Sequence, residues 1–260
     1  MRILCLHGKG TSGFIFKSQT SSFRSHLSDK DIEFDFIDAP YPSTPAPGID
    51  LFYEPPYYCF WEENSVTAIK ASAKWLADLL SRSGPYDAVM CFSQGCYLVA
   101  SALLLHKVHN PTAPPPFKAA IFICGGAPLL LAEDVGFHIS QEMWEQDRAG
   151  SEALSAQADS EAILAQGSNR WVGGGSEVID EEAVRADMKG PYTISIPTIH
   201  VYGSKDPKYV AGVQLSGLCE AGKRRVFNHQ GGHEIPRAEV VSKTIAELVN
   251  WALSQGQQVG

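Results

Sequence analysis

A serine with the surroundings of a nucleophile lies at residue 93. The run CFSQG at 91–95 follows an apolar stretch typical of a strand and precedes a helix-like stretch rich in small residues. In that context a G-x-S-x-G pattern forms a sharp turn that exposes the serine hydroxyl. Gly95 fits the second glycine of the pattern, and Cys91 replaces the first with another small residue. Ser93 is therefore a candidate nucleophile, and an ordinary turn is the alternative.

An acid and a base follow Ser93 along the chain. A serine hydroxyl becomes a good nucleophile when an imidazole takes its proton and a carboxylate holds that imidazole in place. Asp206 follows the apolar run 198–202, and His233 follows the run 224–227. Polar residues after parallel strands gather at the carboxyl edge of the sheet. We therefore expect Ser93, Asp206 and His233 to converge there.

Six other residues compete for these three roles: His229 and His200 for the base, Asp180 and Asp187 for the acid, and Cys91 and Cys96 for a thiol nucleophile. His229 lies nearer the strand end with fewer glycines around it, and His200 alternates within an apolar strand, which favours a core position. The two aspartates fall in a segment that interrupts the sheet pattern. The two cysteines lie inside a strand and a helix, where thiols pack as small apolar groups.

The first loop allows two different uses of its glycines. Residues 8–13, GKGTSG, match G-x-G-x-x-G, and Asp38 ends the next strand, as in a dinucleotide-binding oxidoreductase. The same glycines after His7 can instead turn a backbone N–H toward a developing oxyanion. A lone G-x-G-x-x-G match is weak, so the oxidoreductase remains a distant alternative.

The rest of the chain alternates strand-like and helix-like segments. Six short apolar runs fit strands, at residues 2–6, 34–37, 87–91, 119–124, 198–202 and 224–227. Helical segments between them predict an α/β fold with a mostly parallel, doubly wound sheet and helices on both faces. Residues 128–191 interrupt the alternation with helix-like pieces at 139–147 and 152–164 and a glycine-rich run at 172–175. We expect one domain, 1–260, with 128–191 as an inserted cap.

Composition excludes several classes of function. The chain has 260 residues, is 44% hydrophobic, and carries 21 Lys and Arg against 29 Asp and Glu, a net charge of −8. An acidic chain is a poor nucleic-acid binder, and no apolar stretch approaches the ~20 residues that span a bilayer. The six cysteines form no C-x-x-C pair or zinc-ligand pattern. We expect reduced thiols, a cytoplasmic location, and neither metal nor cofactor.

Four motifs together resemble the fungal family of serine hydrolases within the α/β-hydrolase superfamily. They are LCLHG at 4–8, FSQG at 92–95, GSKD at 203–206 and GHEIP at 232–236. The resemblance runs from residue 2 to about 253. It implies an α/β-hydrolase fold and a carboxylesterase or thioesterase activity. Several members of the family are stand-alone esterases or thioesterases that release an acyl chain from the acyl carrier protein of a polyketide synthase.

Carried over residue by residue, the resemblance implies Ser93 as nucleophile, Asp206 as acid and His233 as base. It also implies an oxyanion hole made by the backbone N–H groups of Lys9 and Gln94. A general short-chain carboxylesterase of unrelated metabolism is the alternative to release of a polyketide chain.

An aromatic segment after the second strand suggests a pocket. Five candidates for the pocket wall are Tyr53, Tyr57, Tyr58, Phe60 and Trp61, and four with less support are Phe14, Phe16, Trp144 and Trp171. Such a wall suits an acyl or aromatic chain, but a loop burying its aromatics is equally consistent with the pattern. An acidic carrier protein would need a basic patch to dock. The candidates are Lys205 with Lys208, or the run 223–225, although solvated charges are the more common case.

Overall fold

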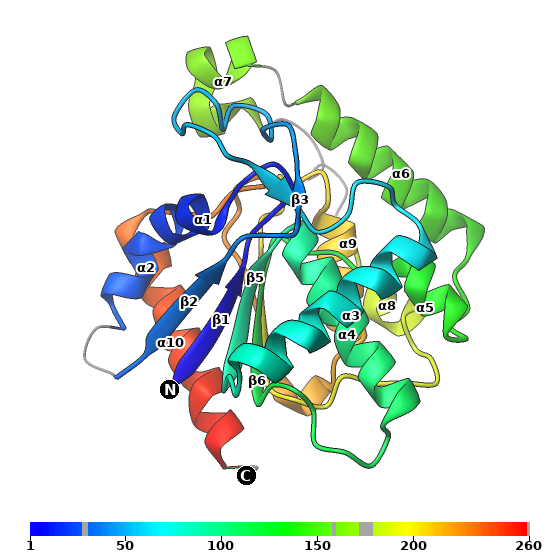
Figure 1. Ribbon diagram of the computed structural model, residues 1–260. Coiled ribbons are helices and arrows are strands. Elements are labelled where there is room, and N and C mark those ends of the chain that lie inside the picture. Colours follow the sequence, from blue (N-terminus) through cyan, green and yellow to red (C-terminus); the bar gives the residue numbers. More distant parts are fainter. Residues whose placement is uncertain (28–30, 158–159, 172–178, 259–260) are drawn as a thin grey trace.

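The computed structural model describes residues 1–27, 31–157, 160–171 and 179–258. A six-stranded sheet forms its centre, in the order β2-β1-β5-β6-β7-β8, with every neighbouring pair parallel (Figure 1). Its strands are β1 (Arg2–Leu6), β2 (Glu33–Ile37), β5 (Ala88–Phe92), β6 (Ala119–Ile123), β7 (Thr198–Tyr202) and β8 (Arg224–Asn228). The six expected strands therefore form, and their ends differ only slightly from the expected bounds.

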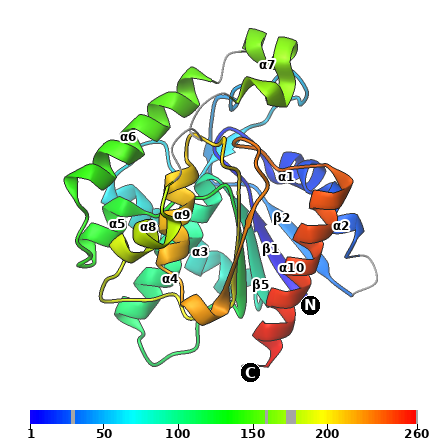
Figure 2. The same ribbon diagram turned by 180° about the vertical axis from the view of Figure 1, so that it is seen from behind.

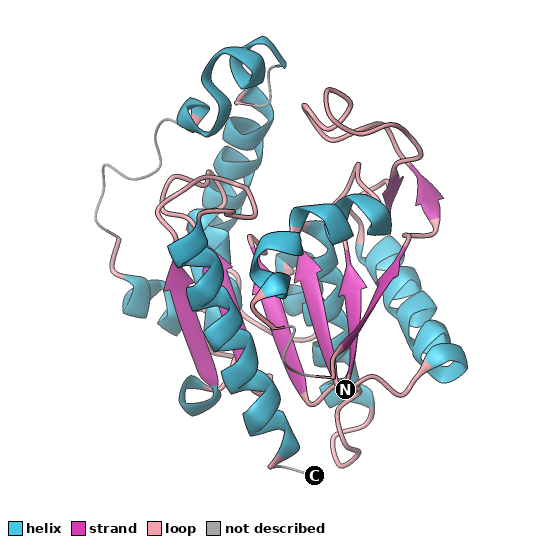
Figure 3. Ribbon diagram, turned by 90° about the vertical axis from the view of Figure 1, so that its left-hand side faces the viewer, coloured by secondary structure: helices cyan, strands magenta, loops and turns pink. Residues whose placement is uncertain are grey.

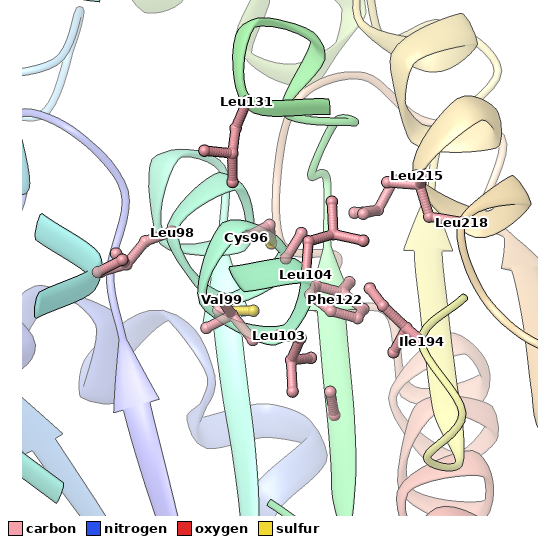
Figure 4. Packing of buried hydrophobic residues seen from close by; sticks show 14 of the residues in the cluster. Cys96, Leu98, Val99, Leu103, Leu104, Phe122, Leu131, Ile194, Leu215 and Leu218 are labelled. Carbon is pink, nitrogen blue, oxygen red and sulfur yellow. The ribbon is translucent and has the colours of Figure 1, made fainter. Parts of the chain in front are cut away.

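Helices cover both faces of this sheet, as Figures 1 and 2 show from opposite sides. The helices on one face include α3 (Val66–Ser83), α4 (Gln94–His109) and α9 (Tyr209–Gly217), and those on the other are α1 (Gly13–Gln19), α2 (Ser21–Ser25) and α10 (Glu239–Gln257). Strands covered on both sides can be apolar throughout, which explains why the sequence shows unbroken apolar runs. Figure 4 shows Leu104 of α4 beside Phe122 of β6, with Leu215 of α9 near them in the same buried cluster.

Two local features differ from the sequence expectation. The region 41–61, which has no periodicity, contains a small antiparallel pair, β3 (Tyr41–Pro42) and β4 (Tyr58–Cys59). The stretch 18–27, whose sequence suggests a single helix, holds the end of α1 and the short helix α2, which meet at Thr20. Helix α1 begins earlier than expected because the Ser12 side chain caps it by accepting a hydrogen bond from the Ile15 N–H at 3.3 Å.

The segment 128–191 holds a further set of helices: α5 (Leu129–Asp134), α6 (Gln141–Ala156), α7 (Ser160–Gln166), the 3₁₀ turn η1 (Gly167–Arg170) and α8 (Glu181–Asp187). The two helices expected at 139–147 and 152–164 have different boundaries, since α6 runs through the gap between them. Helix α5 contacts α3 and α4, and α8 packs on α9. Helices α6 and α7 extend beyond the carboxyl ends of the strands (Figures 1 and 3). The glycine-rich run at 172–175 lies outside the described residues. Within the described ranges, no helix is both long and apolar enough to cross a membrane.

Candidate active site

Ser93 occupies a sharp turn between β5 and α4. Its backbone has φ 49° and ψ −116°, an unusual conformation for a residue with a side chain. Helix α4 starts very close to the end of β1. A Cβ on Gly95 would lie only 2.5 Å from the Leu6 carbonyl oxygen. Cys91 is fully buried, and its thiol donates to the Ile121 carbonyl at 3.4 Å. A cysteine at the place of the first glycine is therefore compatible with the turn.

The structure brings Ser93, His233 and Asp206 into one hydrogen-bonded chain. His233 Nε2 lies 3.1 Å from Ser93 Oγ, and His233 Nδ1 lies 2.8 Å from Asp206 Oδ2. Asp206 is 1% exposed, and its other oxygen accepts the Lys208 backbone N–H at 2.8 Å. The three residues follow β5, β8 and β7, so they meet at the carboxyl edge of the sheet. This arrangement fits a nucleophile, a base and a buried acid.

The competing histidines and aspartates lie outside this chain of bonds. His229 Nδ1 accepts the Gly231 N–H at 3.2 Å, so the ring holds the loop after β8. Burial lowers the pKa of His229, which favours its neutral form. Asp180 caps α8 by accepting the N–H groups of Glu182 and Ala183. Asp187 ends that helix.

The competing cysteines, like the other four, are buried free thiols. Burial raises the pKa of the Cys91 thiol, which keeps it protonated and unreactive. Among the described residues, Cys124 forms a cluster of potential metal ligands with Asp206 and His233. Two of those three groups are already bonded to each other in the Ser93 chain.

The loop after β1 is held rigidly beside Ser93. His7 Nε2 accepts the Ala39 N–H at 3.0 Å, so Nδ1 carries the proton and donates to the Gly8 carbonyl at 2.7 Å. Burial lowers the pKa of His7, which fits this neutral state. The backbone N–H of Gly10 donates to the Tyr58 carbonyl at 2.9 Å. Lys9 therefore lies in a fixed turn at the end of the strand next to β5.

Gln94 fixes a second side of the same region. Its Oε1 accepts the Phe60 N–H and its Nε2 donates to the Trp61 carbonyl, both at 2.9 Å. The sequence points only to the backbone of Gln94, because no local pattern marks the contacts of its side chain. The N–H of Gln94 is the first of α4, and such N–H groups have no partner within the helix. Lys9 and Gln94 thus follow the adjacent strands β1 and β5, next to Ser93.

The dinucleotide alternative for residues 8–13 does not fit their contacts. Asp38 Oδ1 accepts the Gly13 N–H at 2.8 Å, so the carboxylate serves the start of α1 and not a ribose. A Cβ on Gly10 would lie 2.2 Å from the Ala46 backbone nitrogen, so protein backbone fills the space that a pyrophosphate would need.

The aromatic candidates lie in different environments. Phe60 is fully buried and packs between His7 and Trp75, with ring centroids 5.3 and 5.7 Å away. Tyr57 and Trp61 are also buried, Tyr53 and Tyr58 are partly buried, and the Tyr57 hydroxyl donates to the Tyr53 carbonyl at 2.6 Å. For this segment, burial within its own loop accounts for much of the aromatic content.

The four further aromatic candidates for the pocket wall also lie in different environments. Phe16 is fully buried between Phe36 and Phe92, so it belongs to the core, whereas Phe14 is 76% exposed. Trp144 packs against the core cluster from α6. Trp171 is the one of these four that contacts the His233 loop: a Cβ on Gly232 would lie 2.0 Å from its ring.

Substituting alanine for Gly95 tests the close crossing under Ser93. The new Cβ would meet the backbone oxygens of Leu6 and His7 at 2.5 and 2.8 Å, and backbone cannot move aside easily. We expect Gly95→Ala to lose about 1–3 kcal/mol of unfolding free energy and to slow hydrolysis. Urea denaturation and steady-state rates measure both. Gly222→Ala is the control, because no atom lies within 4 Å of its added Cβ; equal behaviour of the two variants would contradict the crossing.

His200 is a core histidine with a consequence for stability at low pH. Its ring stacks on Phe122, and burial lowers its pKa to about 3. The unfolded imidazole takes up a proton near pH ~6.5 while the folded one stays neutral, so stability is lost as pH falls from there toward 3. Below pH ~6 this difference lowers the unfolding free energy by about 1.4 kcal/mol for each pH unit. We expect His200→Gln to lack this part of the pH dependence. Urea unfolding at several pH values tests it, with exposed His109→Gln as control; an unchanged slope in His200→Gln would refute the claim.

Two fungal esterases are similar to this chain over most of its length. The chain is 31% identical to Esterase FPY3 of Fusarium mangiferae over 242 residues, which cover 92% of this chain and 90% of that protein. It is 27% identical to Esterase alnB of Emericella nidulans, with 99% and 98% covered.

Solved structures share the fold at lower identity. The type II thioesterase BorB from the borrelidin biosynthetic cluster is 15% identical with a TM-score of 0.53, covering 97% of this chain and 92% of that one. A variant of Arabidopsis thaliana SOBER1 is 15% identical with a TM-score of 0.51, covering 97% and 99%. The family described as serine hydrolase (FSH1) matches residues 1–245. This chain, with its serine, histidine and aspartate at one edge of a parallel α/β sheet, belongs to the FSH1 family of serine hydrolases.

Proposed function

We propose that this serine hydrolase uses Ser93 as nucleophile, His233 as general base and acid, and Asp206 as the carboxylate that orients the imidazole. The observation that carries the proposal is the continuous chain of hydrogen bonds, 3.1 Å from Ser93 to His233 and 2.8 Å from His233 to Asp206. Asp206 is buried and bonded on both oxygens, so it can hold His233 in one tautomer.

The reaction is a two-step acyl transfer. Ser93 Oγ attacks the carbonyl carbon of an ester or thioester while its proton passes to His233 Nε2. The imidazolium then gives that proton to the leaving alcohol or thiol, and an acyl-enzyme remains. Water attacks the acyl-enzyme, His233 takes a proton from it, and the acid leaves as Ser93 regains its own proton.

The backbone N–H groups of Lys9 and Gln94 stabilise the oxyanion in this proposal. Lys9 lies in the rigid loop after β1, and Gln94 begins α4, whose N-terminus carries a partial positive charge. Each donor of this kind lowers a transition-state barrier by roughly 3 kcal/mol. The Gln94 clamp on Phe60 and Trp61 keeps its backbone in place while the charge develops.

The substrate that we propose is an apolar acyl chain carried as a thioester, as in polyketide release from a carrier protein. Among the described residues, seven large apolar side chains are exposed. Five of them lie on α1, on α7 or in the region 41–61: Phe14, Tyr41, Leu51, Phe52 and Leu164. Ile163 of α7 touches Gly48, and Tyr53 bonds Ser18 of α1 at 3.1 Å, so these elements adjoin. An exposed apolar group at this end of the sheet suits such a chain.

Helices α6 and α7 support the proposal that 128–191 is a cap over the site. The backbone of α6 approaches the Asp206 loop closely, since a Cβ on Gly150 would lie 2.7 Å from the Pro207 carbonyl oxygen. Lys208 also bonds Asp147 of α6 at 2.6 Å. We propose the cytoplasm as the place of action, supported by six free, buried thiols.

Most of the basic residues suggested as docking contacts for a carrier protein are already paired within this chain. Lys208 is already paired with Asp147, and the run 223–225 is engaged as well: Lys223 with Glu220, Arg224 with Glu182, and Arg225 with the Trp251 ring. Lys205 is exposed, and its side chain forms no ion pair within the described part of the chain. We propose Lys205 as the basic contact for an acidic carrier.

A matched substrate panel tests the proposed chemistry. Acyl N-acetylcysteamine thioesters of increasing length are compared with oxygen esters of the same acyl chains, and kcat/KM is measured for each. We expect the thioesters of longer chains to be at least tenfold better substrates. A preference for short oxygen esters would instead assign a general carboxylesterase.

The carrier is tested separately with the same acyl chain on an acyl carrier protein. Lys205→Glu should weaken hydrolysis of the acyl carrier several-fold and leave the N-acetylcysteamine thioester unaffected. Equal effects on both substrates would exclude Lys205 as a docking contact.

A further inference from the structure

The residues on both sides of His233 contact the same tryptophan. Gly232 lies directly under the Trp171 indole, where an added Cβ would be 2.0 Å from Cγ. Glu234 accepts a hydrogen bond from the indole Nε1 to Oε2 at 3.2 Å. Trp171 is 5% exposed, although it comes from the segment 128–191 and not from the sheet. The Trp171 indole therefore contacts both residues that flank His233 in the chain, Gly232 and Glu234.

Neighbours of Trp171 strengthen this contact. The Ser168 hydroxyl donates to the same Glu234 oxygen at 2.9 Å. The Arg170 guanidinium lies over the indole, 4.2 Å from the ring centroid. The negative charge of Glu234 attracts this guanidinium. We call Ser168, Arg170, Trp171 and Glu234 the clasp. It joins a stretch at the end of η1 to the loop that carries His233.

The inner side of the His233 loop rests on the sheet. The Cys124 thiol donates to the Glu234 carbonyl at 3.4 Å, and the Phe92 ring lies 5.3 Å from the imidazole. The stretch 229–238 between β8 and α10 forms no helix or strand, so few regular backbone bonds fix it. The bonds of His233 to Asp206 and Ser93 and the contacts of the clasp therefore act together to set where the imidazole lies.

We propose that Trp171 and Glu234 are positioning residues, which hold His233 between Asp206 and Ser93. The inference rests on the proposed role of His233 as the base. A displacement of about 1 Å in a reacting group can cost on the order of 10² in rate. Loss of the indole should therefore act on kcat and on every reaction that needs an activated Ser93, including those of reagents too small to use an acyl pocket.

Graded substitutions separate positioning from simple packing. Trp171→Ala removes the ring, Trp171→Phe keeps a ring on Gly232 but loses the N–H, Glu234→Ala removes the acceptor, and Glu234→Gln keeps one. Each variant is measured for kcat, for KM, and for the rate constant of Ser93 phosphorylation by diisopropyl fluorophosphate. Trp144→Phe is the matched control, because Trp144 lies in the same segment but packs on the core cluster.

We expect Trp171→Ala to lower kcat and the phosphorylation rate in parallel, on the order of 10²-fold. Trp171→Phe and Glu234→Ala should each lose several-fold, the double variant no more than the worse single one, and Glu234→Gln should recover most of the rate. Trp144→Phe should keep the wild-type kcat even where it lowers the melting temperature. If Trp171→Ala does not fold, the comparison of Trp171→Phe, Glu234→Ala and their double variant carries the test.

Two results would contradict the proposal that Trp171 and Glu234 position His233. One is a wild-type phosphorylation rate in the Trp171 and Glu234 variants that fold, and the other is a change confined to KM, which would make Trp171 a wall of the acyl pocket. Both leave Ser93 phosphorylated. Failure of the proposed function differs, because wild-type Ser93 would then not react with the reagent at all.

Discussion

Ser93→Ala is expected to abolish hydrolysis while leaving the protein folded. Removing the nucleophile of a serine triad costs on the order of 10⁶ in kcat. The Ser93 hydroxyl bonds only to His233 within the described structure, so its loss leaves no buried group of the core without a partner. Rates on an activated ester, with circular dichroism and thermal unfolding, measure both expectations.

The matched control is Ser204→Ala, a serine in the neighbouring Asp206 loop whose hydroxyl takes no part in the chain of bonds. It should keep near-wild-type rates. A Ser93→Ala protein that retained more than about one-thousandth of the wild-type kcat would contradict the assignment, since the expected loss is far larger.

Asp206→Asn carries the second large effect. An asparagine fits the same space and can still accept the Lys208 N–H, but its amide no longer stabilises an imidazolium. It can also donate to Nδ1 and so select the tautomer that cannot take the Ser93 proton. A loss on the order of 10⁴ in kcat is expected, with little change in fold.

Asp180→Asn provides the comparison for that variant. Asp180 is the other acid that the sequence offers, and the structure uses it to cap α8. Asparagine also caps helices well, so this variant should keep its activity and nearly all of its stability. If Asp180→Asn lost activity and Asp206→Asn did not, the acid of the triad would be misassigned.

The sequence predicts the sheet well because burial on two faces leaves a strong signal. Strands such as Ala119–Ile123 and Thr198–Tyr202 are buried at every position, and the sequence shows them as continuous apolar runs. Ser93, Asp206 and His233 are visible for a related reason. Each follows such a run, and parallel strands bring their carboxyl ends to one edge.

Contacts between distant segments leave no comparable signal. The pairing of β3 with β4 depends on two residues in each strand, and nothing in the sequence of 41–61 marks it. The aromatics there suit a pocket or a buried loop equally, and only the packing of Phe60 on His7 and Trp75 shows its burial. Lys208 looks like a free surface charge until Asp147, 61 residues away, is found beside it.

The clasp is the clearest case of this limit. Trp171 and Glu234 are 63 residues apart, and the sequence around Trp171 has neither helical nor strand periodicity. Its contact with Gly232 joins residues that are far apart in the chain, and local sequence patterns do not encode such contacts.

Ser93 should be the one side chain in this protein that reacts as a nucleophile, because His233 and Asp206 activate its hydroxyl. The most direct measurement is mass spectrometry of the wild-type protein and its His233→Ala variant after treatment with a fluorophosphonate. We predict one adduct per wild-type chain, on the peptide that contains Ser93, and labelling slowed by several orders of magnitude in the variant. An adduct on any other residue, or equal labelling of both proteins, would mean that Ser93 is not a nucleophile activated by His233.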